Sequence, residues 1–185
     1  MSHRITGALL VLPLLLAATS AAARDWQVDP AKSSLTFKCS YQGEAFDGKF
    51  GKFTAAIAYD DADPASAKFD VSVDLASVDT QNSDRDDALA GADFFDYKKT
   101  PRAHFVTQSF AKAADGSVEA KGMLTIRNQT KPVTLKVHFA ASGNSATLDV
   151  DTTLKRLDFG LGVSSDWNDI GKDVPVHGHL VLNPK

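Results

Sequence analysis

Two histidines separated by one residue, His177 and His179, have a spacing that could support metal chemistry. In a β-strand, side chains two residues apart project from the same face, so both imidazoles could reach one metal ion. A zinc site needs a third or fourth ligand. The alternation of the surrounding residues places both histidines on the polar, outer face of a strand. We therefore expect solvated histidines and no metal site.

The adjacent charges Arg85 and Asp86 are the second place where chemistry could occur. Such a pair could contact the polar head of a ligand, take part in acid–base catalysis, or fix the loop that carries it. The chain has no Gly-rich phosphate loop, nucleophile elbow or H-E-x-x-H motif. We predict no catalytic residue and no enzyme. The weaker alternative is a hydrolase or isomerase that uses Asp86 or His104.

The elements that must position these residues are mainly β-strands. Most of the chain alternates apolar and polar residues with a period of two, which is typical of antiparallel strands with one wet face. Such stretches occur at residues 35–39, 69–75, 118–127, 133–139, 148–155 and 174–182. About eight strands joined by hairpins predict one all-β domain, an antiparallel up-and-down barrel, because closing the sheet removes its exposed edges.

Two places depart from this pattern. Between Phe50 and Phe53 the alternation of apolar and polar residues is offset by one position. This offset predicts a bulge at residues 51–52 where a long strand bends. Residues 82–92 predict a short helix, because Asn82 or Ser83 can cap it and Gly91 can end it. A helix that interrupts a β chain is well suited to cover or gate a cavity.

The first residues predict export. Arg4, the apolar run 5–16 and the alanines at 21–23 fit a secretory signal peptide, so we expect cleavage of residues 1–23, a barrel domain at 24–185 and a periplasmic location. The net charge is −3, and it becomes −4 without Arg4. This mild acidity argues against binding to nucleic acid. No later segment predicts a transmembrane span, and the single cysteine, Cys39, excludes an internal disulfide.

The predicted barrel interior contains both large and small side chains. Alternation points Phe37, Phe53, Phe69 and Phe105 inward, and it also points inward the small residues Ala55, Ala120, Gly122, Thr152 and Gly178. Small barrels can be filled by their own side chains or can hold one small ligand. Both readings stay open at this point: a cavity for an apolar ligand, or a filled barrel that serves as a partner-binding module.

Several motifs follow one another in order along nearly the whole chain. They are Trp26-Gln27-Val28-Asp29-Pro30, Gly48-Lys49-Phe50 with Phe53, Ser77-Val78-Asp79-Thr80, Arg85-Asp86 with Leu89, Asp93-Phe94-Phe95-Asp96, residues 121–127 with 130–133, and Arg156-Leu157-Asp158-Phe159-Gly160. Together these motifs resemble the YceI-like family. The resemblance implies an exported lipocalin-like barrel that binds an isoprenoid, a quinone tail or a related lipid, with no other cofactor. Ala88 stands where many relatives carry histidine, which argues against an active site in this loop.

The resemblance and the alternation together give a set of expected ligand contacts in the lining and lid. They are Leu35, Phe37, Phe53, Phe69, Val71, Leu89, Phe94, Phe95, Phe105, Leu124, Leu135, Val137, Phe159 and Gly178. Arg85 and Asp86 are expected to fix the loop or contact a head group. A bound isoprenoid quinone or polyprenyl lipid is the expected ligand, and a homodimer and a membrane electron-transfer partner are possible associations.

Overall fold

The computed structural model describes residues 23–114 and 117–185. Apart from Ala23, the signal peptide expected at residues 1–23 lies outside this part of the chain. The described residues form one antiparallel sheet of eleven strand segments. These segments are β1 (Asp25–Val28), β2 (Ser34–Tyr41), β3 (Glu44–Phe50), β4 (Phe53–Ala58), β5 (Lys68–Asp74), β6 (Val78–Asp79), β7 (Arg102–Lys112), β8 (Val118–Ile126), β9 (Gln129–Ser142), β10 (Ser145–Lys155) and β11 (Asp173–Pro184).

The eleven segments make a closed barrel of eight strands, because three strands are each interrupted once. The segments β1 and β2 form one such strand, because both pair with β11. The segments β3 and β4 form the next, because β4 pairs with β1 and β3 pairs with β2. The segments β5 and β6 form the third, because β5 pairs with β4 and β6 pairs with β3. The ring closes where β1 meets β11, with Trp26 opposite Pro184. The remaining neighbours are consecutive in the chain. The expectation of an eight-stranded antiparallel barrel is therefore confirmed.

The interruption between β3 and β4 is the predicted bend. Strand β3 ends at Phe50 and β4 begins at Phe53. The two residues between them are held by Ser77: Gly51 N donates to Ser77 O at 2.9 Å, and Lys52 N donates to Ser77 Oγ at 3.0 Å. These bonds satisfy backbone donors that would otherwise be lost from the sheet ladder.

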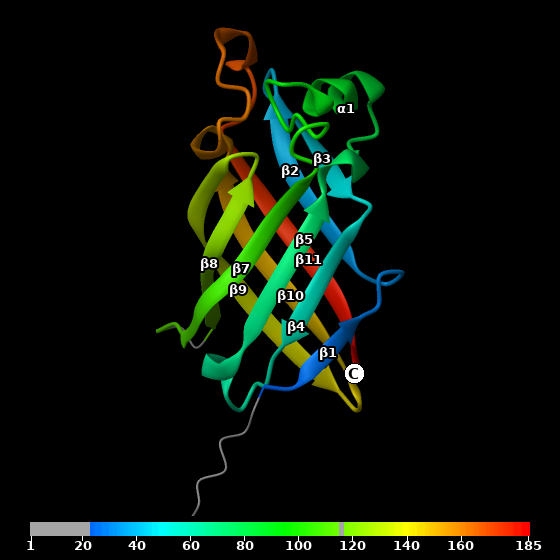
Figure 1. Cartoon of the computed structure of the whole chain (residues 1–185), viewed down its shortest axis with the longest axis vertical. Helices are drawn as coiled ribbons and strands as arrows, with labels where there is room; N and C mark the ends of the chain where they lie inside the picture. Colours follow the sequence, from blue (N-terminus) through cyan, green and yellow to red (C-terminus); the bar gives the residue numbers. More distant parts are fainter. Residues whose placement is uncertain (1–22, 115–116) are drawn as a thin grey trace, which may run out of the picture.

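The one α-helix in the described part of the chain, α1, spans Ser83–Ala90. Its start follows from Asn82, whose Oδ1 accepts a hydrogen bond from Arg85 N at 2.9 Å, and it ends at Gly91. Helix α1 and the segment from residue 156 to 172 lie at the same end of the barrel, and β1 and the C-terminus lie at the other (Figure 1). We call these the α1 end and the closed end.

Apolar side chains inside the barrel gather in two clusters. The closed-end core consists of Trp26, Ile57, Tyr59, Ala67, Phe69, Phe110, Val118, Ala120, Val137, Ala146, Leu148, Leu180 and Leu182. Within it, the Phe69 and Phe110 ring centroids are 4.9 Å apart, and the partly buried Phe139 packs against it with its centroid 4.7 Å from that of Tyr59. Of the four largest fully buried side chains among the described residues, three lie here: Tyr59, Leu148 and Leu182. Each such side chain contributes about 1.5–3 kcal/mol to folding.

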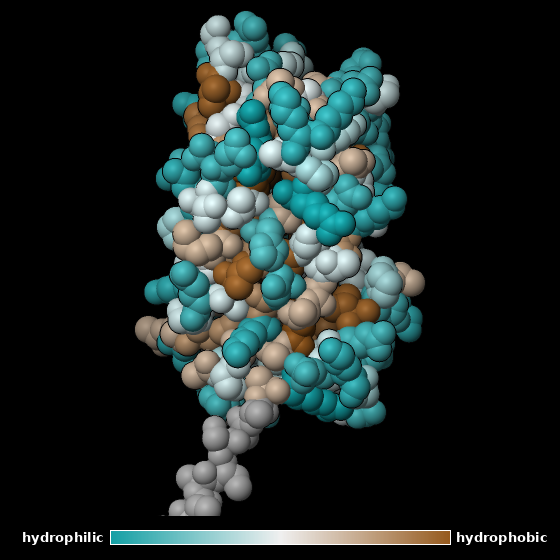
Figure 2. All heavy atoms as spheres, viewed as in Figure 1, coloured by the Kyte–Doolittle hydropathy of each residue, from teal (hydrophilic) through white to brown (hydrophobic). Residues whose placement is uncertain are grey.

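The second cluster lies at the α1 end and consists of Leu75, Phe94, Phe95, Ala103, Ile126, Phe159 and Leu161. It joins the strands to the two irregular segments above them. Polar side chains are spread over the outer face of the barrel, with apolar atoms visible between them (Figure 2).

Candidate functional site

An apolar cavity of about 580 Å³ occupies the α1 end of the barrel interior. Its volume falls in the usual range of about 300–1,000 Å³ for small-molecule sites. Nearly all of its lining is apolar. The lining residues are Leu35, Phe37, Cys39, Tyr41, Phe46, Phe50, Val71, Val73, Leu75, Asn82, Asp84, Arg85, Ala88, Leu89, Phe94, Phe95, Ala103, Phe105, Leu124, Ile126, Val133, Leu135, Val150, Thr152, Leu154, Arg156, Phe159, Leu161, Trp167, Ile170, Val174 and Val176.

Three kinds of element build this lining. The strands supply every second residue, as Leu35 and Phe37 of β2 illustrate. Helix α1 supplies Leu89, and the segment after β10 supplies Leu161 and Trp167. The sequence patterns of a strand and of a capped helix therefore converge on one apolar space, which suits a molecule with little polarity.

Ten of the fourteen expected ligand contacts lie around this cavity. They are Leu35, Phe37, Val71, Leu89, Phe94, Phe95, Phe105, Leu124, Leu135 and Phe159. Phe94 and Phe95 are both buried, with the Phe94 ring centroid 5.0 Å from that of Trp167 and the Phe95 centroid 6.0 Å from that of Phe50. The two rings form part of the wall where the 91–96 segment meets the barrel. Their contact with a ligand stays a prediction.

The other four expected contacts lie outside the cavity. Phe69 and Val137 belong to the closed-end core, and Phe53 packs against that core. Gly178 is buried against Val150, whose Cγ2 would be 2.9 Å from a Cβ added to the glycine. Alternation gives the face of a strand but not the height along the barrel axis, so it could not separate these residues from the lining.

Of the small inward residues, Thr152 lines the cavity, whereas Gly122 and Ala120 leave no empty space. A Cβ on Gly122 would meet the Phe105 ring at 2.6 Å, so this glycine makes room for an aromatic side chain. Ala120 is fully buried within the closed-end core. The cavity arises because the α1 end is roofed by irregular segments rather than filled by side chains from opposite strands.

Arg156 lines the cavity, although the sequence analysis quoted it only within the motif at residues 156–160 and assigned it no role. It is only 5% exposed, and its five N–H groups donate to five backbone carbonyls, those of Leu161, Gly162, Trp167, Ile170 and Gly171, at 2.6–3.0 Å. Burial lowers the pKa of Arg156 from its ordinary value. Because every donor is used, this guanidinium holds the wall of the cavity in place and has none left for a ligand.

The two charged residues expected at the loop have separate positions. Arg85 lines the cavity, with Cζ 4.2 Å from the centroid of the Phe46 ring. Asp86 lies outside it and accepts hydrogen bonds from Thr80. Arg85 also donates to Thr80, from Nε and Nη2. Both side chains thus tie α1 to Thr80, which lies between β6 and the helix, and only Arg85 borders the space for a ligand.

The histidines lie on the outer face, each beside an aspartate. His177 Nδ1 is 2.8 Å from Asp151 Oδ1, and His179 Nδ1 is 2.6 Å from Asp149 Oδ1. In residues 23–114 and 117–185, no group of three or more His, Cys, Asp or Glu side chains could hold a metal ion. Burial raises the pKa of the Cys39 thiol, which lines the cavity, so this thiol is a weak nucleophile.

A family model described as the YceI-like domain matches residues 26–182. Relatives agree over almost the full length. A UPF0312 protein of Pseudomonas putida is 33% identical over 190 residues, covering 96% of this chain and 98% of the relative. A UPF0312 protein of Vibrio cholerae is 31% identical over 168 residues, covering 86% of this chain and 89% of the relative.

Solved structures share the fold. BcnA of Burkholderia cenocepacia superposes with a TM-score of 0.79 at 32% identity, covering 84% of this chain and 99% of that one. A polyisoprenoid-binding domain from Saccharophagus degradans, described as implicated in plant cell wall breakdown, gives a TM-score of 0.67 at 17% identity and covers 88% and 99%. Within the described residues, no helix has the length and apolarity needed to cross a membrane.

Proposed function

We propose that this chain, which belongs to the YceI-like family, binds one long apolar molecule in the cavity at the α1 end of its barrel. The observation that carries this proposal is the lining, in which strand, helix and loop residues converge on one apolar space of about 580 Å³. Each methylene transferred from water into such a space contributes about 0.8 kcal/mol. A long tail can therefore bind tightly without a set of polar contacts.

An isoprenoid, such as a quinone tail or polyprenyl lipid, is the ligand class we favour. The barrel of this chain superposes on a domain named as polyisoprenoid-binding, at an identity where only the fold is shared. The family membership supports an apolar ligand in general. The cavity argues against the filled barrel that a pure partner-binding module would have.

We further propose that the protein acts in the periplasm as a carrier or store, after removal of the segment at residues 1–23. A binding role without catalysis agrees with a site that offers no nucleophile and base in contact. Delivery to a membrane electron-transfer partner, or action as a homodimer, would extend this role.

The direct test is native mass spectrometry and lipid extraction of the purified protein, followed by loading with geranylgeraniol, a ubiquinone and oleamide. We expect one apolar molecule per chain. A protein that carries none and takes up none of the three would refute the proposal. The matched variants are Val71→Phe, which fills part of the cavity, and Thr54→Phe, which adds the same ring on the exposed face of β4. Only the first should reduce uptake.

A further inference from the structure

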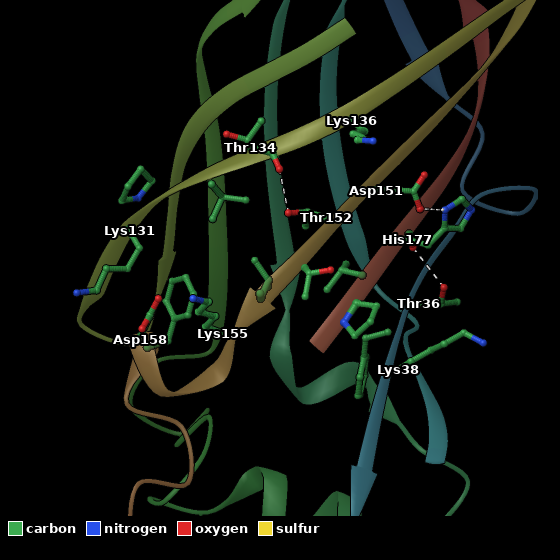
Figure 3. Close-up of a pocket in the computed structure, with 18 of the residues that line it drawn as sticks. Thr36, Lys38, Lys131, Thr134, Lys136, Asp151, Thr152, Lys155, Asp158 and His177 are labelled. Carbon is green, nitrogen blue, oxygen red and sulfur yellow. Dashed lines mark hydrogen bonds and ion pairs between the residues drawn. The ribbon is translucent and has the colours of Figure 1, made fainter. Parts of the chain in front are cut away.

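The wall of the barrel is not continuous between β9 and β10. The ladder between these strands runs from Ser142 opposite Ser145 to Lys136 opposite Asp151 and stops there. Strand β9 still extends to Gln129 on one side, and β10 extends to Lys155 on the other. One side-chain bond follows the last rung, from Thr152 Oγ1 to Thr134 O at 2.9 Å, and the two strands then diverge (Figure 3). We call the space beyond this bond the β9–β10 gap.

An outer recess of about 910 Å³ lies against this gap. Four residues that border the gap, Val133, Thr152, Leu154 and Phe159, line both the recess and the inner cavity. In a regular ladder, backbone hydrogen bonds would hold the wall closed between two such spaces. Here side chains alone separate the recess from the cavity. Side chains can change rotamer on a fast timescale, so this part of the wall can open without breaking the sheet.

The recess differs from the cavity in charge. It contains four lysines and three carboxylates, a balance of plus one in a chain whose net charge is −3. Lys131, Lys136 and Lys155 have no ion pair within 4.0 Å in the described part of the chain, and Lys131 is half-buried. Glu119 and Asp158 also line the recess, and neither has a cationic partner within 4.0 Å in residues 23–114 and 117–185, whereas Asp151 contacts His177. Lys131, Lys155 and Asp158 lie on the side where the strands diverge (Figure 3).

The α1 side of the cavity is less suited to an anion. The cavity lining there includes Asp84 and Arg85, and the guanidinium of Arg85 is already bonded to Thr80. Asp86 and Asp87 follow on the same short helix. Near α1 a negatively charged group would meet Asp84 and a guanidinium that is already bonded. At the gap, the three ammonium groups without an ion pair outnumber the carboxylates of Glu119 and Asp158, so Coulomb attraction favours the gap.

We propose that the β9–β10 gap is a lateral portal, through which the apolar tail of an amphiphile passes into the cavity while its anionic head group stays in the outer recess beside Lys131 and Lys155. This inference rests on the proposed function, because it gives the route and orientation of the same ligand. The head group it implies is a phosphate or a carboxylate, which lysine binds as a point charge.

The route is tested by joining the strands across the gap. Thr134 and Thr153 are replaced by cysteine in a Cys39→Ala background and linked by oxidation or by a short bis-maleimide, with the link verified by intact mass. The control link joins Thr54→Cys to Ser72→Cys, which are opposite each other in the complete β4–β5 ladder. We expect the gap link to slow release of preloaded geranylgeranyl phosphate at least about ten-fold and the control link to leave it unchanged.

The head-group site is tested with two probes that share one tail, geranylgeranyl phosphate and geranylgeraniol. Lys131→Gln with Lys155→Gln should weaken binding of geranylgeranyl phosphate about ten-fold and leave binding of geranylgeraniol unchanged, because only the phosphate is attracted to the two lysine charges that the substitutions remove. Lys52→Gln with Lys121→Gln, two exposed lysines outside the recess, is the matched control. Free inorganic phosphate at the same concentration should not displace either probe.

Distinct results separate this inference from the proposed function. If wild-type protein binds both probes but the gap link leaves release unchanged, the ligand uses another route and the portal is wrong. If the lysine variants weaken both probes equally, or free phosphate displaces the bound phosphate probe, the head-group assignment is wrong. If the wild-type protein takes up neither probe, the proposed function itself fails.

Discussion

Asp86 accepts two hydrogen bonds from a single residue, Thr80: one from the backbone N at 3.0 Å and one from Oγ1 at 2.7 Å, both to the same carboxylate oxygen. Thr80 is only 3% exposed. The carboxylate therefore satisfies two polar groups that water does not reach. This contact joins the helix at the cavity to the end of β6.

Replacing Asp86 by alanine should lower the free energy of unfolding by about 1–3 kcal/mol, because it leaves the buried N–H of Thr80 without an acceptor. Urea unfolding would measure the loss. Asp87→Ala is the control, since Asp87 is exposed on the same helix. Equal stability of the two variants would show that the bonds to Thr80 contribute nothing.

Arg156→Met should destabilise the protein by at least about 3 kcal/mol, because five backbone carbonyls lose a charged donor at once. Arg156→Lys should not restore stability, because an ammonium group has three donors and lacks the planar shape of the guanidinium. Chemical denaturation gives both values. Lys155→Met, at the exposed neighbouring position, provides the reference, and a lysine variant as stable as wild type would contradict this account.

Gly160 and Gly162 form a matched pair, since both have positive φ, +69° and +61°, but only one is crowded. Gly160→Ala should cost about 1–2 kcal/mol, the ordinary cost of a left-handed alanine. Gly162→Ala should cost clearly more, because its Cβ would lie 2.8 Å from the Phe94 ring and 2.9 Å from Arg156 Nη1. Thermal unfolding of both variants would measure the difference. Adding Phe94→Leu to Gly162→Ala should recover part of the loss, and no recovery would argue against the clash.

Ionisation of the Tyr59 hydroxyl should lower the free energy of unfolding at high pH. Burial, with Asp61 close to the hydroxyl, raises the pKa of Tyr59 from 10.0 to about 12. The folded state therefore keeps a proton that the unfolded state releases, and this contribution is complete below pH 10 and disappears as the pH rises toward 12. The free energy of unfolding should fall by about 2–3 kcal/mol over this window.

Comparison with Tyr59→Phe isolates this effect from the lysines that titrate in the same range. The difference in unfolding free energy between wild type and variant, measured by urea unfolding at a series of pH values, should be constant below pH 10 and change above it. A difference that stays constant throughout would mean that Tyr59 titrates alike in both states.

The strands and the helix could be predicted because their signals are local. Alternation of apolar residues identifies a strand whichever strand it pairs with. Asn82 caps α1 through a hydrogen bond to Arg85, which is only three residues further along the chain. Phe37 and Phe69 show what alternation cannot predict. Both point inward, but Phe37 lines the cavity and Phe69 lies in the closed-end core. Their difference depends on position along the barrel axis, which no local pattern contains.

Two features of the site could not be predicted from the sequence for the same reason. The β9–β10 gap exists because two strands part after the rung between Lys136 and Asp151, although each strand continues with regular alternation. The role of Arg156 depends on carbonyls up to fifteen residues away, brought together by the fold of one irregular segment. Neither the gap nor the role of Arg156 can be recognised from residue type or spacing.

The division of the barrel into a packed closed end and a hollow α1 end bears on how such proteins diverge. Since most proteins tolerate only a few kcal/mol of destabilisation, substitutions at Leu148 or Leu182, which are completely buried, would be removed by selection. Lining residues that are only partly buried, such as Leu35 and Val71, carry less of the fold and are freer to drift. Descendants of one ancestral barrel could therefore change which apolar molecules fit the cavity while keeping their architecture.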